Sequence, residues 1–399
     1  MFTLARPSRK QSPRFIVLTA SGILCLAASC IQAPAANGAP PRPAETSAPL
    51  PVATTPASPA AARPASNAGQ RAAAERMLTA AEQALAGLHD LEGIRPRAWE
   101  FMAETLTWHR RRLEAQLLLY PEGPQRAAAL GEYLTTTRQY AADQQARRNI
   151  NATPNAVNLA AYAEAEAEYL AASDGALPAA QTPEQQAAAQ RMIDAATLVV
   201  QDILDLEHSR PRTPEFLQLR LEALRRQLDA NLLLNPAGPQ RQAFVEGYLA
   251  QARQCASDVN ARKNLDATPA TIAQTEYAVA DAELLAAGPA APPDVVARLQ
   301  AAAKQVYDGL LRIAPIQPRT PESLALRLEW MKKLMAADLL AHPRPADQRP
   351  FLEQYAAEAR QSALDIKRRV SIDATRAHVA MTEYAVAQAD YFLAGSAVP

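Results

Sequence analysis

The side chains best suited to chemistry in this sequence are five histidines, three cysteines and many acidic and basic residues. The histidines lie at unrelated positions, and none has a second histidine or an aspartate at the spacing of metal ligands. They are His89, His109, His208, His342 and His378. The sequence also lacks a glycine-rich phosphate loop, a nucleophile elbow and a dinucleotide fingerprint. We therefore predict no metal site and no cofactor.

A catalytic thiol or a pair of catalytic carboxylates is not predicted either. Cys255 lies on the apolar side of a predicted helix, where a small buried residue is expected. Glu164, Glu166 and Glu168 occupy every second position of another predicted helix, and this spacing spreads them around the helix. We therefore predict no catalytic residues and a non-enzymatic protein. An enzyme whose site is assembled from distant segments is a third hypothesis.

Three copies of one pattern fill most of the sequence after residue 69. Each copy has a Pro-Arg break, a proline-rich turn about 25 residues later, and a threonine marker that precedes a tyrosine. The copies are offset by 115 residues and then by 107 residues. The tyrosines in register are Tyr162, Tyr277 and Tyr384. A residue type that fills the same position three times is more typical of architecture than of catalysis.

Two sets of charged residues recur in this register. A glutamate lies in the first turn of the second helix of each copy, where a carboxylate favours the positive end of the helix. A basic doublet follows on the same helix, and we predict that it lies on the solvated face beside neighbouring glutamates. The alternative is a basic stripe that meets lipid head groups or glycan. The residues are Glu100, Glu215 and Glu322, and Arg110-Arg111, Arg225-Arg226 and Lys332-Lys333.

The second copy predicts four helices. Thr182 caps the first, and Gln185 completes its capping box. Thr213 and Thr268 are the proposed caps of the second and fourth, and Thr320 repeats the second cap in the next copy. The predicted apolar faces are Met192, Ala196, Val200, Ile203 and Leu206; Leu217, Leu221, Leu224, Leu228 and Leu232; Phe244, Tyr248, Ala252, Cys255 and Val259; and Tyr277 and Leu284.

The sequence therefore predicts an all-α fold of three tandem repeats of 107–115 residues, each with four helices. Whether each Pro-Arg break is a kink, which would give two long antiparallel arms, or a reversal, which would give a four-helix bundle, is left open. Acidic and basic residues number 41 each, so no net charge favours nucleic acid as a partner. The predicted segments are a signal peptide 1–29, a disordered Pro/Ala-rich tether 30–68, and repeats 69–175, 182–288 and 293–395.

The N-terminal segment is typical of export. Basic residues precede an apolar stretch, residues 15–28, that is too short for a comfortable membrane span. The ending Leu26-Ala27-Ala28-Ser29-Cys30 resembles the lipobox of bacterial lipoproteins. The resemblance implies that Cys30 is the lipid attachment site, and Ile31 in place of an aspartate favours the outer membrane. Cleavage near residues 33–35 and an uncleaved anchor are the alternatives.

The third copy carries a second resemblance. A helix with Tyr307 and Gly309, a break, and a helix from Pro321 to Leu340 resemble the coiled hairpin of TolC-type outer-membrane efflux proteins. The segment Thr275–Leu285 is similar to the Ala-Glu helix of that family. The resemblance implies a trimeric periplasmic tunnel of paired helices. It therefore supplies an alternative function, a TolC-like outer-membrane efflux component.

The function predicted first is a non-enzymatic cell-envelope lipoprotein that serves as a helical repeat scaffold or partner-binding spacer. Its expected location is the periplasmic side of the bacterial envelope, with the outer membrane favoured. Its expected partners are the membrane, through the lipid on Cys30, and other envelope proteins. The sequence does not predict the oligomeric state.

Overall fold

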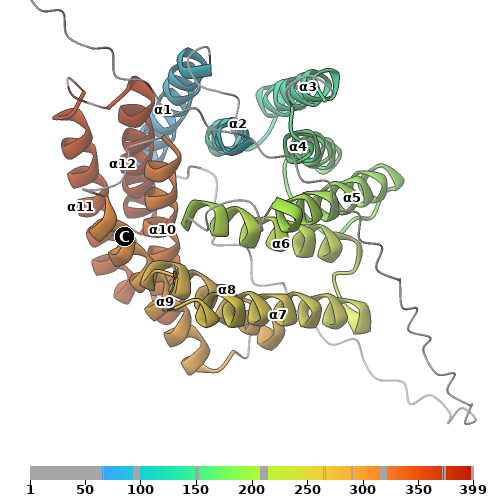
Figure 1. Cartoon of the computed structure of the whole chain (residues 1–399). Coiled ribbons are helices and arrows are strands. Elements are labelled where there is room, and N and C mark those ends of the chain that lie inside the picture. Colours follow the sequence, from blue (N-terminus) through green and yellow to red (C-terminus); the bar gives the residue numbers. More distant parts are fainter. Residues whose placement is uncertain are drawn as a thin grey trace, which may run out of the picture. The chain divides into compact units, whose positions relative to one another are not determined.

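The computed structural model describes residues 65, 67–92, 99–148, 152–206, 214–263, 265, 267–288, 291–314, 321–370, 372 and 374–396. In these residues the chain forms twelve helices and no strand, so the all-α prediction is confirmed (Figure 1). The helices are α1 (Ala68–Glu92), α2 (Trp99–Leu119), α3 (Pro124–Ala146), α4 (Pro154–Ala172), α5 (Pro183–Leu206), α6 (Pro214–Leu234), α7 (Gly238–Ala261), α8 (Pro269–Ala287), α9 (Pro293–Ile313), α10 (Pro321–Ala341), α11 (Pro345–Lys367) and α12 (Arg376–Ser396). None of the helices in these ranges combines the length and the hydropathy that a membrane crossing requires.

Threonine caps start several of the helices. At α5 the backbone N–H of Gln185 donates to Thr182 Oγ1 at 3.2 Å, and the N–H of Thr182 donates to Gln185 Oε1 at 3.1 Å. This is the predicted capping box, and it satisfies donors that have no partner inside the helix. Thr268 accepts from the N–H of Thr271 at 3.1 Å and caps α8. The other proposed caps, Thr213 and Thr320, lie outside the described residues.

Consecutive helices pack side by side along the chain. The pairs α1–α2, α5–α6 and α9–α10 are all in contact, so the chain reverses direction between their members. An ion pair of 3.7 Å between Glu82 on α1 and Arg112 on α2 illustrates this packing. The Pro-Arg breaks lie outside the described residues, but the contacts of the flanking helices show that the collinear alternative is wrong. The reversal of the other alternative is confirmed, but the four-helix bundle that it implied is not shown, because among the described residues α1 contacts neither α3 nor α4.

The first and last helices of the described chain also pack together. The contact between α1 and α12 is more extensive than any other contact between two helices (Figure 1). At one end of this pair Asn67 accepts from the N–H of Gln70 at 2.8 Å and donates from Nδ2 to the carbonyl of Ala394 at 3.0 Å. Helix contacts therefore run from α1 to α12 and back to α1, and we call this closed series the helix circuit. The helices α2 and α6 each contact α10 as well.

The predicted apolar faces match the core closely but not fully. The leucine stripe of α6 is buried from Leu217 to Leu228. On α7 the prediction starts one residue early, because Phe244 is 36% exposed while Val245 is fully buried. Val245 continues the helical spacing of Tyr248 and Ala252, whereas Phe244 lies on the adjacent solvated side.

Candidate functional site

A polar cavity of about 460 Å³ lies between α2, α6, α8 and α10. Three of these helices meet only through tertiary contacts, since α2, α6 and α10 are far apart in the sequence. The lining is dominated by charged residues together with Gln218, Tyr277 and Trp330. Because it gathers charged groups from separate segments, this cavity is the candidate functional site.

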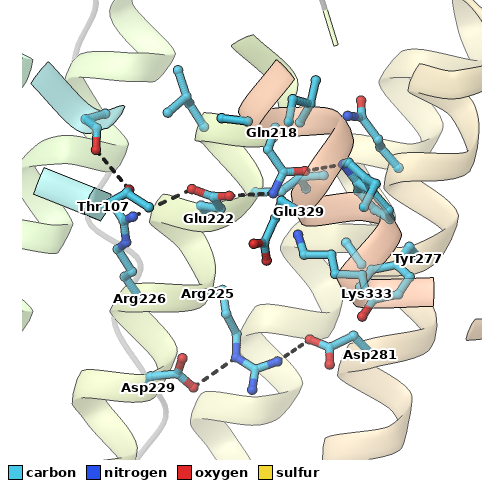
Figure 2. A pocket seen from close by; sticks show the side chains of 18 of the residues that line it. Thr107, Gln218, Glu222, Arg225, Arg226, Asp229, Tyr277, Asp281, Glu329 and Lys333 are labelled. Carbon is cyan, nitrogen blue, oxygen red and sulfur yellow. Dashed lines mark hydrogen bonds and ion pairs between the residues drawn. The ribbon is translucent and has the colours of Figure 1, made fainter. Parts of the chain in front are cut away.

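One wall of the cavity is an arginine held between two aspartates. The guanidinium of Arg225 donates to Asp229 at 2.9 Å and also to Asp281 on α8, and Figure 2 shows it between the two carboxylates. Burial disfavours the charged form of Arg225, but these aspartates outweigh burial and raise its pKa well above its ordinary value. Burial raises the pKa of Asp229 despite the attraction of Arg225. The group therefore joins α6 to α8 by charge-assisted hydrogen bonds.

A second polar chain crosses the cavity from α6 to α10. Arg226 lies 3.6 Å from Glu222, and Gln218 Nε2 donates to Glu222 at 2.6 Å (Figure 2). The amide oxygen of Gln218 in turn accepts from the indole N–H of Trp330 at 3.1 Å. Each polar group in this chain thus has a partner, and a fixed orientation for Glu222 follows from its two donors.

Glu329 on α10 connects the cavity to α2. Its carboxylate lies 3.4 Å from the guanidinium of Arg111. Burial opposes ionisation, but the positive charges of Lys332, Lys333 and Arg111 outweigh burial and hold the pKa of Glu329 below its usual range. Glu329 is therefore ionised at neutral pH and attracts cations from two separate segments of the chain.

The basic doublets face the inside of the molecule, so the prediction of a solvated outer face is wrong. The side chains of Arg110 and Arg111 are only 24% and 13% exposed. Arg110 does pair with the neighbouring Glu114, at 3.4 Å, as the prediction supposed for nearby glutamates. Amphipathic patterning places charges outside, but a polar cavity between helices offers them a second location.

The second residue of each doublet lies over a tyrosine of an earlier or later segment. Arg111 is 5.8 Å from the ring centroid of Tyr384, Arg226 is 5.9 Å from Tyr162 and Lys333 is 5.8 Å from Tyr277. Arg111 and Lys333 also lie over the rings of Trp108 and Trp330, at 4.5 Å and 4.6 Å. The three tyrosine contacts are cation–π interactions that link helices not consecutive in the chain, whereas the two tryptophan contacts lie within α2 and within α10. The three tyrosines identified by register thus have equivalent surroundings.

A carboxylate on α4, α8 or α12 binds two arginines in each of three sets of residues. Glu168 pairs with Arg138 at 2.8 Å and with Arg191. The same arrangement recurs at Glu283, with Arg253 at 3.0 Å and Arg298 at 2.6 Å, and at Asp390, with Arg360 at 2.5 Å and Arg76 at 3.0 Å. We call each set an arginine clamp. Each clamp joins three helices: α3, α4 and α5; α7, α8 and α9; or α11, α12 and α1.

The clamp residues follow the offsets of 115 and 107 residues, with Arg76 preceding Arg191 by 115. A comparison of all charged positions in the three copies of the sequence pattern, and not of the basic doublets alone, would have found the clamp residues. The same comparison also relates Thr107, Glu222 and Glu329, which line the cavity one helical turn before the doublets' second residues. These positions were missed because only two of the three carry a charge.

Two helix backbones approach each other closely at the α12–α1 contact and again at the α8–α9 contact. A Cβ built on Gly87 of α1 would lie 2.6 Å from the backbone nitrogen of Ala377 on α12. A Cβ built on Gly309 of α9 would lie 2.7 Å from the Cβ of Ala270 on α8. At the α4–α5 junction the equivalent position is Asp202, which accepts from Asn158 Nδ2 at 2.7 Å. Glycine is therefore required at the α12–α1 and α8–α9 contacts but not at the α4–α5 contact.

The cysteine and two of the histidines considered as catalytic or metal-binding residues take part in packing and helix capping. Cys255 is fully buried. The side chain of His378 accepts from the backbone N–H of Thr375 at 2.9 Å at the start of α12. His109 packs beside Tyr140, with ring centroids 5.9 Å apart. In the described ranges no three His, Cys, Asp or Glu side chains come together as metal ligands.

Two of the three neighbouring glutamates of α4 contact the same arginine, Arg138. Glu164 lies 3.8 Å from Arg138 and Glu166 lies 3.9 Å from Arg110, while Glu168 belongs to a clamp. Glu164 and Glu168, four residues apart, therefore share one face of α4, and only Glu166 lies on another face as the predicted spread requires. Cys30, the signal peptide, His208 and the side chains of Glu100, Glu215 and Glu322 lie outside the described residues.

Comparisons with known proteins found no matching family, no similar curated protein and no similar solved structure. The resemblances to bacterial lipoproteins and to TolC-type efflux proteins therefore stay predictions. What the chain does has to be argued from its own contacts.

Proposed function

We propose that the twelve helices form three four-helix units, α1–α4, α5–α8 and α9–α12, closed head to tail. The arginine clamps support this grouping, because each one joins the last helix of one unit to the first helix of the next. The cation–π contacts of Arg226, Lys333 and Arg111 support it too, since each reaches a tyrosine of the preceding unit. Closure gives both terminal units a partner, whereas open repeat arrays need special capping units.

We propose that this closed assembly is a non-enzymatic scaffold of the bacterial cell envelope, anchored by a lipid on Cys30. The observation that carries the proposal is the repeated arginine clamp. Its charged residues pair with one another across the contacts between units, so they stabilise the assembly. The cavity supports the same interpretation. Arg225, Arg226 and Glu329 each have an oppositely charged neighbour, which suits the joining of helices and the binding of a polar partner more than the activation of a nucleophile.

Metabolic labelling tests the anchor. Cells that produce the full chain are grown with a labelled fatty acid, and the Cys30→Ala chain is the matched control. We expect label in the wild-type protein and none in the variant, because Cys30 would be the acylated residue. Equal labelling of both chains, or labelling of neither, would contradict the lipid anchor.

Cross-linking of intact envelopes tests the scaffold. The acylated chain is captured after cross-linking and the linked peptides are identified by mass spectrometry. We expect links to other envelope proteins that persist in a Glu222→Gln variant, whose cavity has lost one carboxylate. Links only between three copies of this chain would instead favour the TolC-like efflux component. Turnover of a small molecule that disappears with Glu222→Gln would favour an enzyme.

A further inference from the structure

Large aliphatic side chains project into solvent from equivalent turns of the chain. Leu265, in the turn between α7 and α8, is 81% exposed, and Ile372, between α11 and α12, is 74% exposed. The two positions are 107 residues apart and so correspond in the repeated pattern. Ile150 stands at this position in the first copy, outside the described residues. Single exposed aliphatic residues are common, but exposure that recurs in register requires an explanation.

These turns lie at the same edge of the helix circuit. The start of α3 meets the end of α4, where Arg126 donates to Asp174 at 3.0 Å. The start of α7 meets the end of α8, and the start of α1 meets the end of α12. Neighbouring helices are thus antiparallel, and the C-terminal ends of the odd-numbered helices share one edge. We call it the odd edge.

Other exposed aliphatic residues lie at the odd edge. Leu204 and Leu311 occupy equivalent positions in the last turns of α5 and α9, and are 37% and 42% exposed. Leu364 and Val370, which flank the end of α11, are each 51% exposed. Among the described residues the odd edge therefore presents a discontinuous set of apolar side chains.

Basic residues accompany these apolar side chains. Arg148 and Lys263 are exposed, and Lys263 lies two residues before Leu265. Lys367 and Arg368 precede Ile372, and they lie 2.9 Å from Glu383 and 3.7 Å from Asp365. Aliphatic tips beside cations are suited to the boundary of a bilayer. There the aliphatic groups leave water while the cations remain near lipid phosphates.

We infer that the odd edge docks this protein onto a bilayer that contains anionic lipid. The partner is assigned by chemistry, since separate aliphatic tips with adjacent cations fit a fluid charged surface better than a shaped protein groove. The inference deepens the proposed anchored scaffold by giving it an orientation on the membrane. It depends on the described turns and does not depend on the acylation of Cys30.

Fluorescent labels on the two edges test the inference in the full chain. Leu265→Cys places a label on the odd edge. Leu340→Cys, at a side chain that is 49% exposed at the end of α10, places a matched label on the opposite edge. Each protein is reconstituted on vesicles of phosphatidylglycerol and phosphatidylcholine that contain a shallow lipid-bound quencher.

We expect the label at residue 265 to be quenched and the label at residue 340 to be unaffected. Replacing two of the exposed cations, Arg148→Glu with Lys263→Glu, should lower the quenched fraction about tenfold or more. Vesicles of pure phosphatidylcholine should also lower the quenched fraction. Equal behaviour of the two labels would overturn the inference. The inference would also be overturned if envelope proteins shielded the label at residue 265 in the absence of lipid.

The quenching result is separable from the proposed function. Absence of acyl label with quenching at residue 265 would reject the lipid anchor and keep the docking edge. Acyl label without quenching would keep the anchor and reject the docking edge.

Discussion

Replacement of Gly87 by alanine tests the contact between the first and last helices. In most helix interiors this change stabilises the helix by about 1 kcal/mol, because alanine has the higher helix propensity. At Gly87 the new methyl group would lie 2.6 Å from a backbone nitrogen and 2.9 Å from the Cα and Cβ of Ala377. Backbone atoms cannot move aside as a flexible side chain can. Overpacking of this kind costs about 1–3 kcal/mol.

Helical glycines in open surroundings provide the control. A Cβ built on Gly131 or Gly247 would meet nothing within 4 Å. Gly131→Ala should therefore raise the free energy of unfolding, while Gly87→Ala should give a value about 1–3 kcal/mol below that of Gly131→Ala. Gly309→Ala should resemble Gly87→Ala, because its Cβ would lie 2.7 Å from Ala270.

The assay is urea unfolding of each variant followed by circular dichroism. A midpoint shift at constant slope reports the change in stability. If Gly87→Ala stabilised the protein as much as Gly131→Ala does, α1 would not lie against α12, and the closed circuit would be refuted.

Two further changes have expected outcomes. Burial, assisted by Arg112 and opposed by Glu132, lowers the pKa of His109 from 6.5 to about 4. The unfolded chain therefore binds the extra proton first, and up to about 3 kcal/mol of stability should be lost as the pH falls from 6.5 to 4. His109→Leu, which copies Leu224, should remove this part of the acid sensitivity. Urea titrations between pH 4 and 6.5 measure the effect. A pH profile unchanged by the substitution would refute the role of His109. Thr268→Ala should cost about 1 kcal/mol in thermal or urea unfolding, because the N–H of Thr271 loses its acceptor, whereas Thr268→Ser should be nearly neutral.

Local features of the fold were predictable from the sequence because local chemistry determines them. Thr182 and Gln185 form the expected box, and the α6 leucines are buried as their spacing requires. The register of α7 was misjudged by one residue because Phe244 is larger and more apolar than Val245, although only Val245 continues the buried face.

Features that depend on distant contacts were harder to predict. Arg110 and Arg111 were expected in solvent because amphipathic patterning within one helix does not reveal carboxylates on distant helices, here Glu166 and Glu329. The pairing of α1 with α12 leaves no periodic signal within either helix. A signal does exist at Arg76, since Arg191 and Arg298 occupy its position in the other copies and each meets a carboxylate of the preceding helix.

The most direct test of the central claim is a disulfide between α1 and α12. A Cβ built on Gly69 would lie 3.2 Å from the Cβ of Ala394, so a small movement of the helix ends gives the separation of about 3.5–4.5 Å found in disulfides. The full chain carries Gly69→Cys and Ala394→Cys together with Cys255→Ser, which copies Ser362. The closed circuit predicts that the two cysteines form an intrachain disulfide in the folded protein, identified by mass spectrometry of the linked peptides. A folded chain in which both thiols stay free, or link only to other chains, would contradict it.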